Sequence, residues 1–115
     1  MDRKTILNKL INYEEPLEVL HSELSRHEWD LDKELIELRR EHIVNIIQKY
    51  LNNEITKDEL IGWANAVEMR DDIEYENGHE KLIATTLNEL NTPEINNPIK
   101  REYLLDIIAT LLLRP

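Results

Sequence analysis

Apolar side chains recur at helical spacing along almost the whole chain. The spacing i, i+3, i+4, i+7 marks one face of an α-helix, and only two glycines and four prolines interrupt it. The helical segments centre on residues 2–13, 17–24, 35–51, 60–67, 82–90 and 99–112. No segment alternates apolar and polar residues for long enough to predict a strand. We therefore expect an all-α, single-domain bundle of five or six helices and no sheet.

The longest apolar stripe, over residues 35–51, predicts the central helix of the bundle. Asp30 or Asp32 can cap its N-terminus. The three later helical segments are expected to pack against it as antiparallel neighbours, because the connections between them are short. His42 lies on this stripe. We expect a core or boundary histidine that is hydrogen-bonded to the backbone, and not a metal ligand.

The clearest helix start is the sequence Thr56-Lys-Asp-Glu59. It matches a capping box, in which the Thr56 hydroxyl accepts from the Glu59 backbone N–H and the Glu59 carboxylate reaches back to the backbone of Thr56. Ile55 and Leu60 take the positions of a hydrophobic staple, which fixes how the chain enters the helix. Trp63 lies on the apolar face of this helix, so we expect it in the core.

Length and composition indicate one helical domain over residues 1–115, in which residues 1–27 form either a loosely packed helical arm or a docking element. The chain has no cysteine, which excludes disulfides and thiolate metal sites. The N-terminus lacks the unbroken apolar segment of a signal peptide, and no apolar run approaches ~18 residues. These features predict a cytoplasmic protein without a membrane association.

Negative charge is concentrated in residues 68–80, which we call the acidic run. The chain has 14 Lys and Arg against 24 Asp and Glu, a net charge of −10 and a pI near 4.8. The acidic run holds six carboxylates against one full positive charge, Arg70, and so carries half of the net charge. This concentrated field fits a basic protein partner. It argues against direct binding of nucleic acid, because phosphate contacts need Lys and Arg.

We predict that the acidic run is the surface that binds the partner. The core contacts are expected to be Asp71, Asp72, Glu74, Tyr75 and Glu76, with Glu68 and Glu80 at the flanks. Tyr75 is the expected anchor, since aromatic residues are enriched among binding hot spots. Reversing the charges of Asp72 and Glu74 should then slow association without lowering the melting temperature. In the alternative interpretation, Ile73 and Tyr75 fold inward and the carboxylates are only solvated. Trp29 is a further candidate, either packed on the central helix or in contact with the partner.

No group of residues in the sequence matches a catalytic or metal site. No two histidines have the i, i+3 or i+4 spacing of a helical metal pair. Asp72-x-Glu74-x-Glu76 resembles a calcium loop, but Gly78 falls one place late and Ile83 stands where the closing glutamate is needed. The chain has no phosphate-binding loop and no nucleophile elbow. We therefore expect no enzymatic activity, no cofactor and no metal. The strongest enzyme alternative is a carboxylate-rich site within the bundle that binds Mg²⁺ or Mn²⁺.

The stretch Tyr50-Leu-Asn-Asn-Glu-Ile-Thr-Lys-Asp-Glu-Leu60, followed by Trp63, resembles small bacterial immunity proteins of the colicin D type. That family consists of acidic helical bundles that neutralise a basic, tRNA-cleaving toxin in the cytoplasm. Residues 71–98 do not match the pattern, and no toxin-contacting residue carries over. The resemblance favours an immunity or antitoxin-type inhibitor of a basic toxin such as a nuclease. The alternative is a general adaptor or regulatory helical protein.

Overall fold

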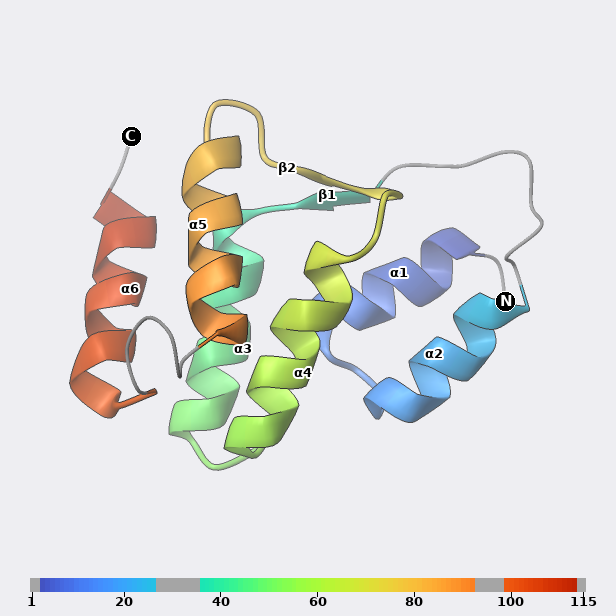
Figure 1. Ribbon diagram of the computed structural model, residues 1–115, viewed down its shortest axis with the longest axis horizontal. Coiled ribbons are helices and arrows are strands. Elements are labelled where there is room, and N and C mark those ends of the chain that lie inside the picture. Colours follow the sequence, from blue (N-terminus) through green and yellow to red (C-terminus); the bar gives the residue numbers. More distant parts are fainter. Residues whose placement is uncertain (1–2, 27–35, 93–98, 114–115) are drawn as a thin grey trace.

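The described part of the chain consists of six helices and two very short strands (Figure 1). The structure is a computed structural model that describes residues 3–26, 36–92 and 99–113. The elements in chain order are α1 (Arg3–Asn12), α2 (Leu17–Ser25), β1 (Ile36–Leu38), α3 (Arg40–Leu51), α4 (Lys57–Glu68), β2 (Ile73–Tyr75), α5 (Glu80–Asn91) and α6 (Arg101–Leu113). The predicted all-α bundle is confirmed.

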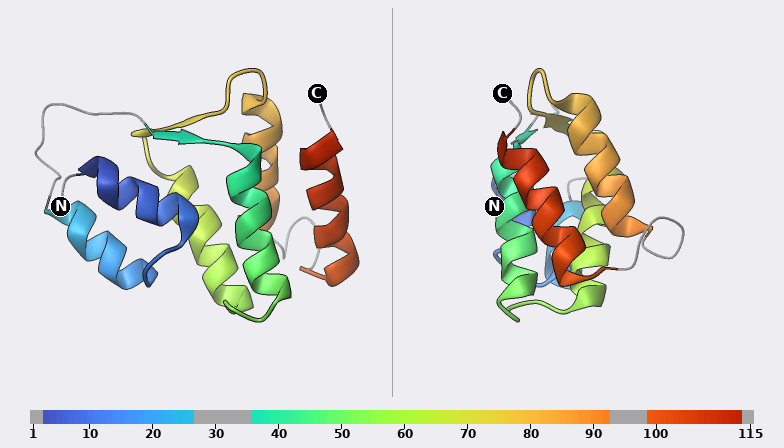
Figure 2. Two further views of the ribbon diagram at one scale, coloured as in Figure 1. Left: turned by 180° about the vertical axis from the view of Figure 1, so that it is seen from behind. Right: turned by 90° about the vertical axis from the view of Figure 1, so that its left-hand side faces the viewer.

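The helices are arranged along the long axis of the molecule. The pair formed by α1 and α2 lies at one end and α6 lies at the other, with α3, α4 and α5 between them (Figures 1 and 2). α3 packs against α4 and α6, as expected of the central helix. The main neighbour of α5 is α4, and not α3 as the sequence suggested. In Figure 1 the two strands lie above α4, beside the upper parts of α3 and α5.

The expectation of no sheet was wrong in one detail, because β1 and β2 form a two-stranded parallel sheet. Ile36 pairs with Ile73 and Leu38 pairs with Tyr75. Parallel neighbours need a long crossover connection, and here α3 and α4 provide it. The central helix consequently begins at Arg40, later than expected. The predicted caps before residue 35 lie outside the described residues.

Both ends of α3 are fixed by local hydrogen bonds. At its start the backbone N–H of Arg39 donates to Nδ1 of His42 at 2.9 Å. His42 is half-buried, so the predicted boundary histidine with a backbone hydrogen bond is confirmed. At its end Asn53 adopts a left-handed φ of 62°, which asparagine tolerates well. The N–H groups of Asn53 and Glu54 then donate to the carbonyl oxygens of Tyr50 and Lys49, which closes a Schellman motif.

The N-terminal hairpin of α1 and α2 is an integral part of the core. Ile6, Leu7 and Leu10 are completely buried. The indole N–H of Trp63, itself completely buried on α4, donates to the carbonyl oxygen of Leu10 at 2.7 Å. The core placement predicted for Trp63 is confirmed. Over residues 3–26 the chain is therefore packed into the bundle, and not loosely attached to it.

The capping box at the start of α4 is present as predicted. The Glu59 N–H donates to the Thr56 hydroxyl at 3.1 Å, and the Thr56 N–H donates to the Glu59 carboxylate at 2.8 Å. Ile55 and Leu60, the two staple positions, are both buried.

Replacing Thr56 with alanine removes the hydroxyl acceptor and is expected to lower the free energy of unfolding by about 1 kcal/mol. Urea denaturation followed by circular dichroism measures this change. Thr56→Ser is the matched control, because serine retains the acceptor and should restore most of the loss. Equal stabilities for Thr56→Ala and the wild type would show that the cap contributes nothing.

Candidate partner-binding surface

The acidic run extends from the end of α4 through β2 to the first turn of α5, along the upper edge of the molecule in Figure 1. The seven predicted contact residues thus lie on one continuous segment, but their side chains differ in exposure. Asp72 is buried, and Tyr75 and Glu76 are partly buried. The exposed members are Glu68, Asp71, Glu74 and Glu80. Trp29 lies outside the described residues.

The carboxylate of Asp72 forms ion pairs with two arginines of the same chain. Its side chain is 2% exposed, and its two oxygens accept from Nε and Nη2 of Arg70 at 2.8 and 2.7 Å. Nε of Arg3, at the start of α1, lies 3.9 Å away. Burial by itself raises the pKa of Asp72, but the hydrogen bonds and the charge of Arg70 outweigh it, so the pKa falls below its usual range. Reversing the charge of Asp72 is therefore expected to destabilise the fold, whereas the sequence alone suggested an unchanged melting temperature.

Glu76 caps the N-terminus of α3. Its carboxylate accepts from the backbone N–H of Arg40 at 3.0 Å and from Nε and Nη2 of the same residue at 3.1 and 3.3 Å. These hydrogen bonds from Arg40 lower the pKa of Glu76 below its usual range. Glu76 thus fastens the end of β2 to the start of α3, where the positive end of the helix dipole also favours a carboxylate.

Two of the apolar members of the run, Ile73 and Tyr75, turn toward the interior. Ile73 is buried, and Tyr75 is partly buried against the core. Burial, and next the charge of Glu68, raises the pKa of Tyr75. Tyr75 therefore offers a partner only part of its side chain.

A glutamate that the sequence did not single out lies beside the run. The parallel register places Glu37 directly opposite Glu74, and both side chains are exposed. Like charges directly opposite one another on neighbouring strands are destabilising. Arg39 offsets part of this at 3.5 Å from Glu37, whereas no ion pair is found for Glu74 among the described residues. We call the exposed carboxylates Glu37, Glu68, Asp71 and Glu74 the acidic edge.

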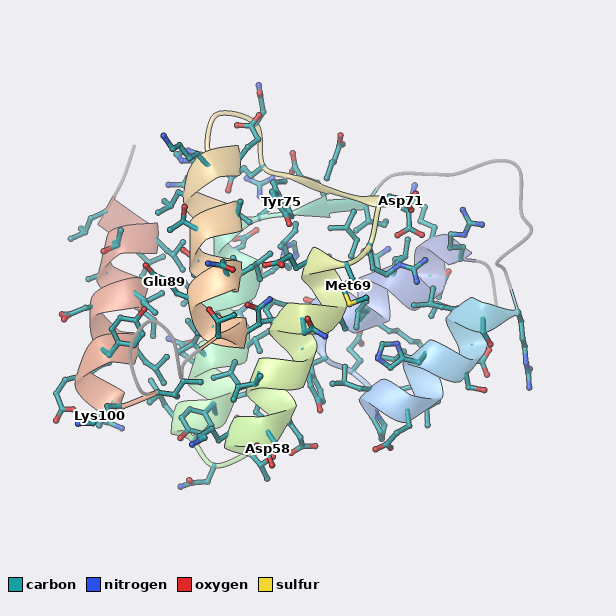
Figure 3. All side chains as sticks on the ribbon, in the orientation of Figure 1. Asp58, Met69, Asp71, Tyr75, Glu89 and Lys100 are labelled. Atoms are coloured by element: carbon teal, nitrogen blue, oxygen red, sulfur yellow. The ribbon has the colours of Figure 1, made fainter. Side chains whose placement is uncertain are left out.

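Met69 is the second residue that sequence reasoning missed. It is the C-cap of α4 and is 76% exposed. Figure 3 shows Met69, Asp71 and Tyr75 along one stretch of surface, from the end of α4 to β2. The helical phase of Leu60, Trp63 and Val67 could have revealed this exposure, because position 69 falls off their buried face. A large, flexible apolar side chain thus lies among carboxylates.

Two clefts involve α6, and the first of them has Glu76 of the acidic run in its wall. One, of about 190 Å³, is formed between the start of α3 and the end of α6, and the other, of about 210 Å³, lies between α5 and α6. Both are smaller than the roughly 300–1,000 Å³ typical of small-molecule sites. Within the described residues, no three His, Asp or Glu side chains are grouped closely enough to hold a metal ion. The absence of an enzymatic activity stays a prediction.

Comparisons with protein-family models, with curated proteins and with solved structures give no significant match for this chain. The resemblance to immunity proteins stays a prediction. Among the helices that the structure describes, none has both the length and the apolar composition needed to cross a bilayer.

Proposed function

We propose that this protein is an acidic protein-binding module of the immunity or antitoxin type, which binds and neutralises a basic toxin such as a nuclease in the cytoplasm. The proposal rests on how the charges of the acidic run are placed: its arginine pairs with a buried carboxylate, and most of the other carboxylates are exposed. Arg70, its only arginine, is hydrogen-bonded to the buried Asp72. Four carboxylates of the run remain exposed: Glu68, Asp71, Glu74 and Glu80. The run therefore presents almost uniformly negative charge to a partner.

The internal ion pairs support this role by holding the surface in place. Asp72 joins the segment before β2 to α1 through Arg3, and Glu76 joins the end of β2 to α3 through Arg40. Exposed charges on a backbone that is already ordered attract a basic partner without a large ordering cost on binding. The repulsion between Glu37 and Glu74 would be relieved by an arginine or lysine placed between them.

The mechanism of inhibition is steric and electrostatic. A nuclease needs a positively charged cleft to hold its phosphate substrate. The acidic edge would occupy this cleft, or cover it, with carboxylates in the place of phosphates. Met69 would supply an apolar contact within the charged surface, as adaptable methionines do at binding surfaces. The long-range charge mainly accelerates association, and desolvated pairs mainly slow dissociation.

The direct test begins with the neighbouring gene. A toxin C-terminal domain encoded immediately upstream is expected to kill cells when expressed alone and to be harmless when co-expressed with this protein. For the purified pair, Asp71→Lys with Glu74→Lys should lower the association rate about tenfold and reduce its dependence on salt. The melting temperature should stay nearly unchanged, because both side chains are exposed. Stopped-flow mixing at two salt concentrations measures the rates.

Glu54→Lys with Asp58→Lys is the matched control. This pair changes the net charge equally, but both residues are exposed at the opposite end of α4, where Figure 3 labels Asp58. It should leave the association rate close to that of the wild type. Met69→Ala should instead raise the dissociation rate. Equal effects of the two double reversals would show that only net charge matters, and the acidic edge would then not be the docking surface.

A further inference from the structure

The turn between β2 and α5 contains an asparagine followed by a glycine, Asn77-Gly78, a pair that occurs nowhere else in the chain. The N–H of His79 donates to the carbonyl oxygen of Glu76 at 3.0 Å, which closes the turn. Asn77 has a negative φ, whereas Gly78 has a left-handed φ of 86°. A hydrogen-bonded turn with these two signs is a type II turn, whose third residue is usually glycine. In Figure 1 the connection arches away from the helices at the top of the molecule.

Both residues at the tip of this turn are accessible. Asn77 and Gly78 are exposed, and a Cβ placed on Gly78 would meet no other atom within 4 Å. Within the described part of the chain, neither the N–H of Gly78 nor the side-chain amide of Asn77 takes part in a hydrogen bond. The side-chain amide carbon and the next backbone nitrogen are therefore close along the chain, and no other contact holds either of them.

The other described asparagines differ in the backbone nitrogen that follows them. Asn12, Asn52 and Asn53 also lie at helix ends, but the next N–H in each case donates to a carbonyl oxygen at 2.8–3.1 Å. Asparagines inside the helices are followed by N–H groups that belong to the helical hydrogen bonds. Each of these nitrogens also carries a residue with a side chain. The turn after β2 is thus distinguished both by its unbonded nitrogen and by the glycine that supplies it.

We propose that Asn77 is a site of spontaneous deamidation. The backbone nitrogen of Gly78 attacks Cγ of Asn77, and glycine has no side chain to hinder this approach. The N–Cγ bond forms, the Cγ–Nδ2 bond breaks, and the proton of the attacking nitrogen leaves with the amide nitrogen as ammonia. One water molecule then opens the resulting succinimide ring. Opening at Cγ gives aspartate, and opening at the main-chain carbonyl carbon gives isoaspartate. The conversion requires only the chain and water, and no partner.

The two products affect the fold differently. Each carries a carboxylate in place of the amide and so adds one negative charge to the net charge of −10, within the acidic run. Isoaspartate also inserts an additional carbon atom into the main chain. The turn is anchored on one side by Glu76, whose N–H donates to Leu38 and whose carboxylate binds Arg40, and on the other by the carbonyl oxygen of His79, which accepts from Ile83. The isoaspartate form must therefore displace an anchor, whereas the aspartate form changes only the charge.

Ion exchange and peptide mapping by mass spectrometry, during prolonged incubation of the folded protein at physiological temperature, test the site. A more acidic species should grow with time, and its added mass should map to Asn77, while the exposed Asn53 keeps its amide. Asn77→Gln should abolish this species, because the longer side chain would have to close a larger ring. Asn53→Gln is the matched control and should leave the conversion unchanged. A wild type that stays a single species, or conversion of Asn53 at an equal rate, would overturn the proposal.

Thermal melting of the separated products tests the effect on the turn. The isoaspartate form should melt below the unconverted protein, because its longer main chain disturbs the anchors of β2 and α5. Asn77→Asp provides the charge without the additional atom and should melt close to the wild type, because the side chain at this position is exposed. Equal melting temperatures for the isoaspartate form and Asn77→Asp would overturn the proposed displacement of an anchor.

Discussion

Trp63→Ala is expected to lower the free energy of unfolding by about 4 kcal/mol, which is a large part of the 5–15 kcal/mol typical of a whole domain. Trp63 is completely buried on α4, between the N-terminal hairpin and the rest of the bundle. Its loss leaves a large cavity and also removes the 2.7 Å hydrogen bond to Leu10. Denaturation followed by far-UV circular dichroism measures the effect.

Trp63→Phe separates the two contributions. Phenylalanine fills much of the cavity but cannot donate to the carbonyl oxygen of Leu10. That oxygen still accepts from the N–H of Tyr13 at 3.1 Å and so keeps one hydrogen bond. Loss of the indole hydrogen bond should therefore lower the free energy of unfolding by about 1 kcal/mol, in addition to the effect of the smaller side chain. A loss below about 2 kcal/mol for Trp63→Ala would mean that α1 and α2 collapse into the cavity.

The helices could be predicted because their information is local. A helix needs an apolar face repeating every three or four residues, and the capping box at Thr56 marks a start within four residues. The strands could not be predicted, since each has only three residues and three residues cannot show alternation. Residues 36–38 even fit the helical period of the following helix, because Leu38 and His42 are four apart. Their pairing with β2 depends on contacts distant in sequence.

The candidate surface was predictable in its charge but not in its detail. The concentration of carboxylates in residues 68–80 is visible in the sequence. The sequence does not reveal that Arg3 and Arg40 lie beside Asp72 and Glu76, because these partners are 36 or more positions away. For the same reason it could not place Glu37 opposite Glu74. Which carboxylates face a partner is decided by the tertiary fold.

Asp72→Asn is expected to lower the free energy of unfolding by about 3 kcal/mol at neutral pH, because removing one member of a buried ion pair leaves an uncompensated charge. Arg70, 28% exposed, can turn toward water, whereas the side chain of Arg3, at the start of α1, is only 8% exposed. The loss should therefore loosen α1 from the sheet. Glu74→Gln, two residues away on the exposed face, is the matched control and should change stability by less than about 0.5 kcal/mol.

The dependence of this loss on pH identifies its cause. The pKa of Asp72 is lowered in the folded protein, so its ionised form contributes stability that is fully present above the unfolded pKa of about 3.9. This contribution is lost as the pH falls through that value toward the lower folded pKa. The gap between wild type and Asp72→Asn should be constant from about pH 7 to pH 5 and should shrink below about pH 4. Urea denaturation of both proteins across this range measures the gap. A gap that persists unchanged at low pH would show that asparagine disturbs the packing, and that the charge of Asp72 is not what joins α1 to the segment before β2.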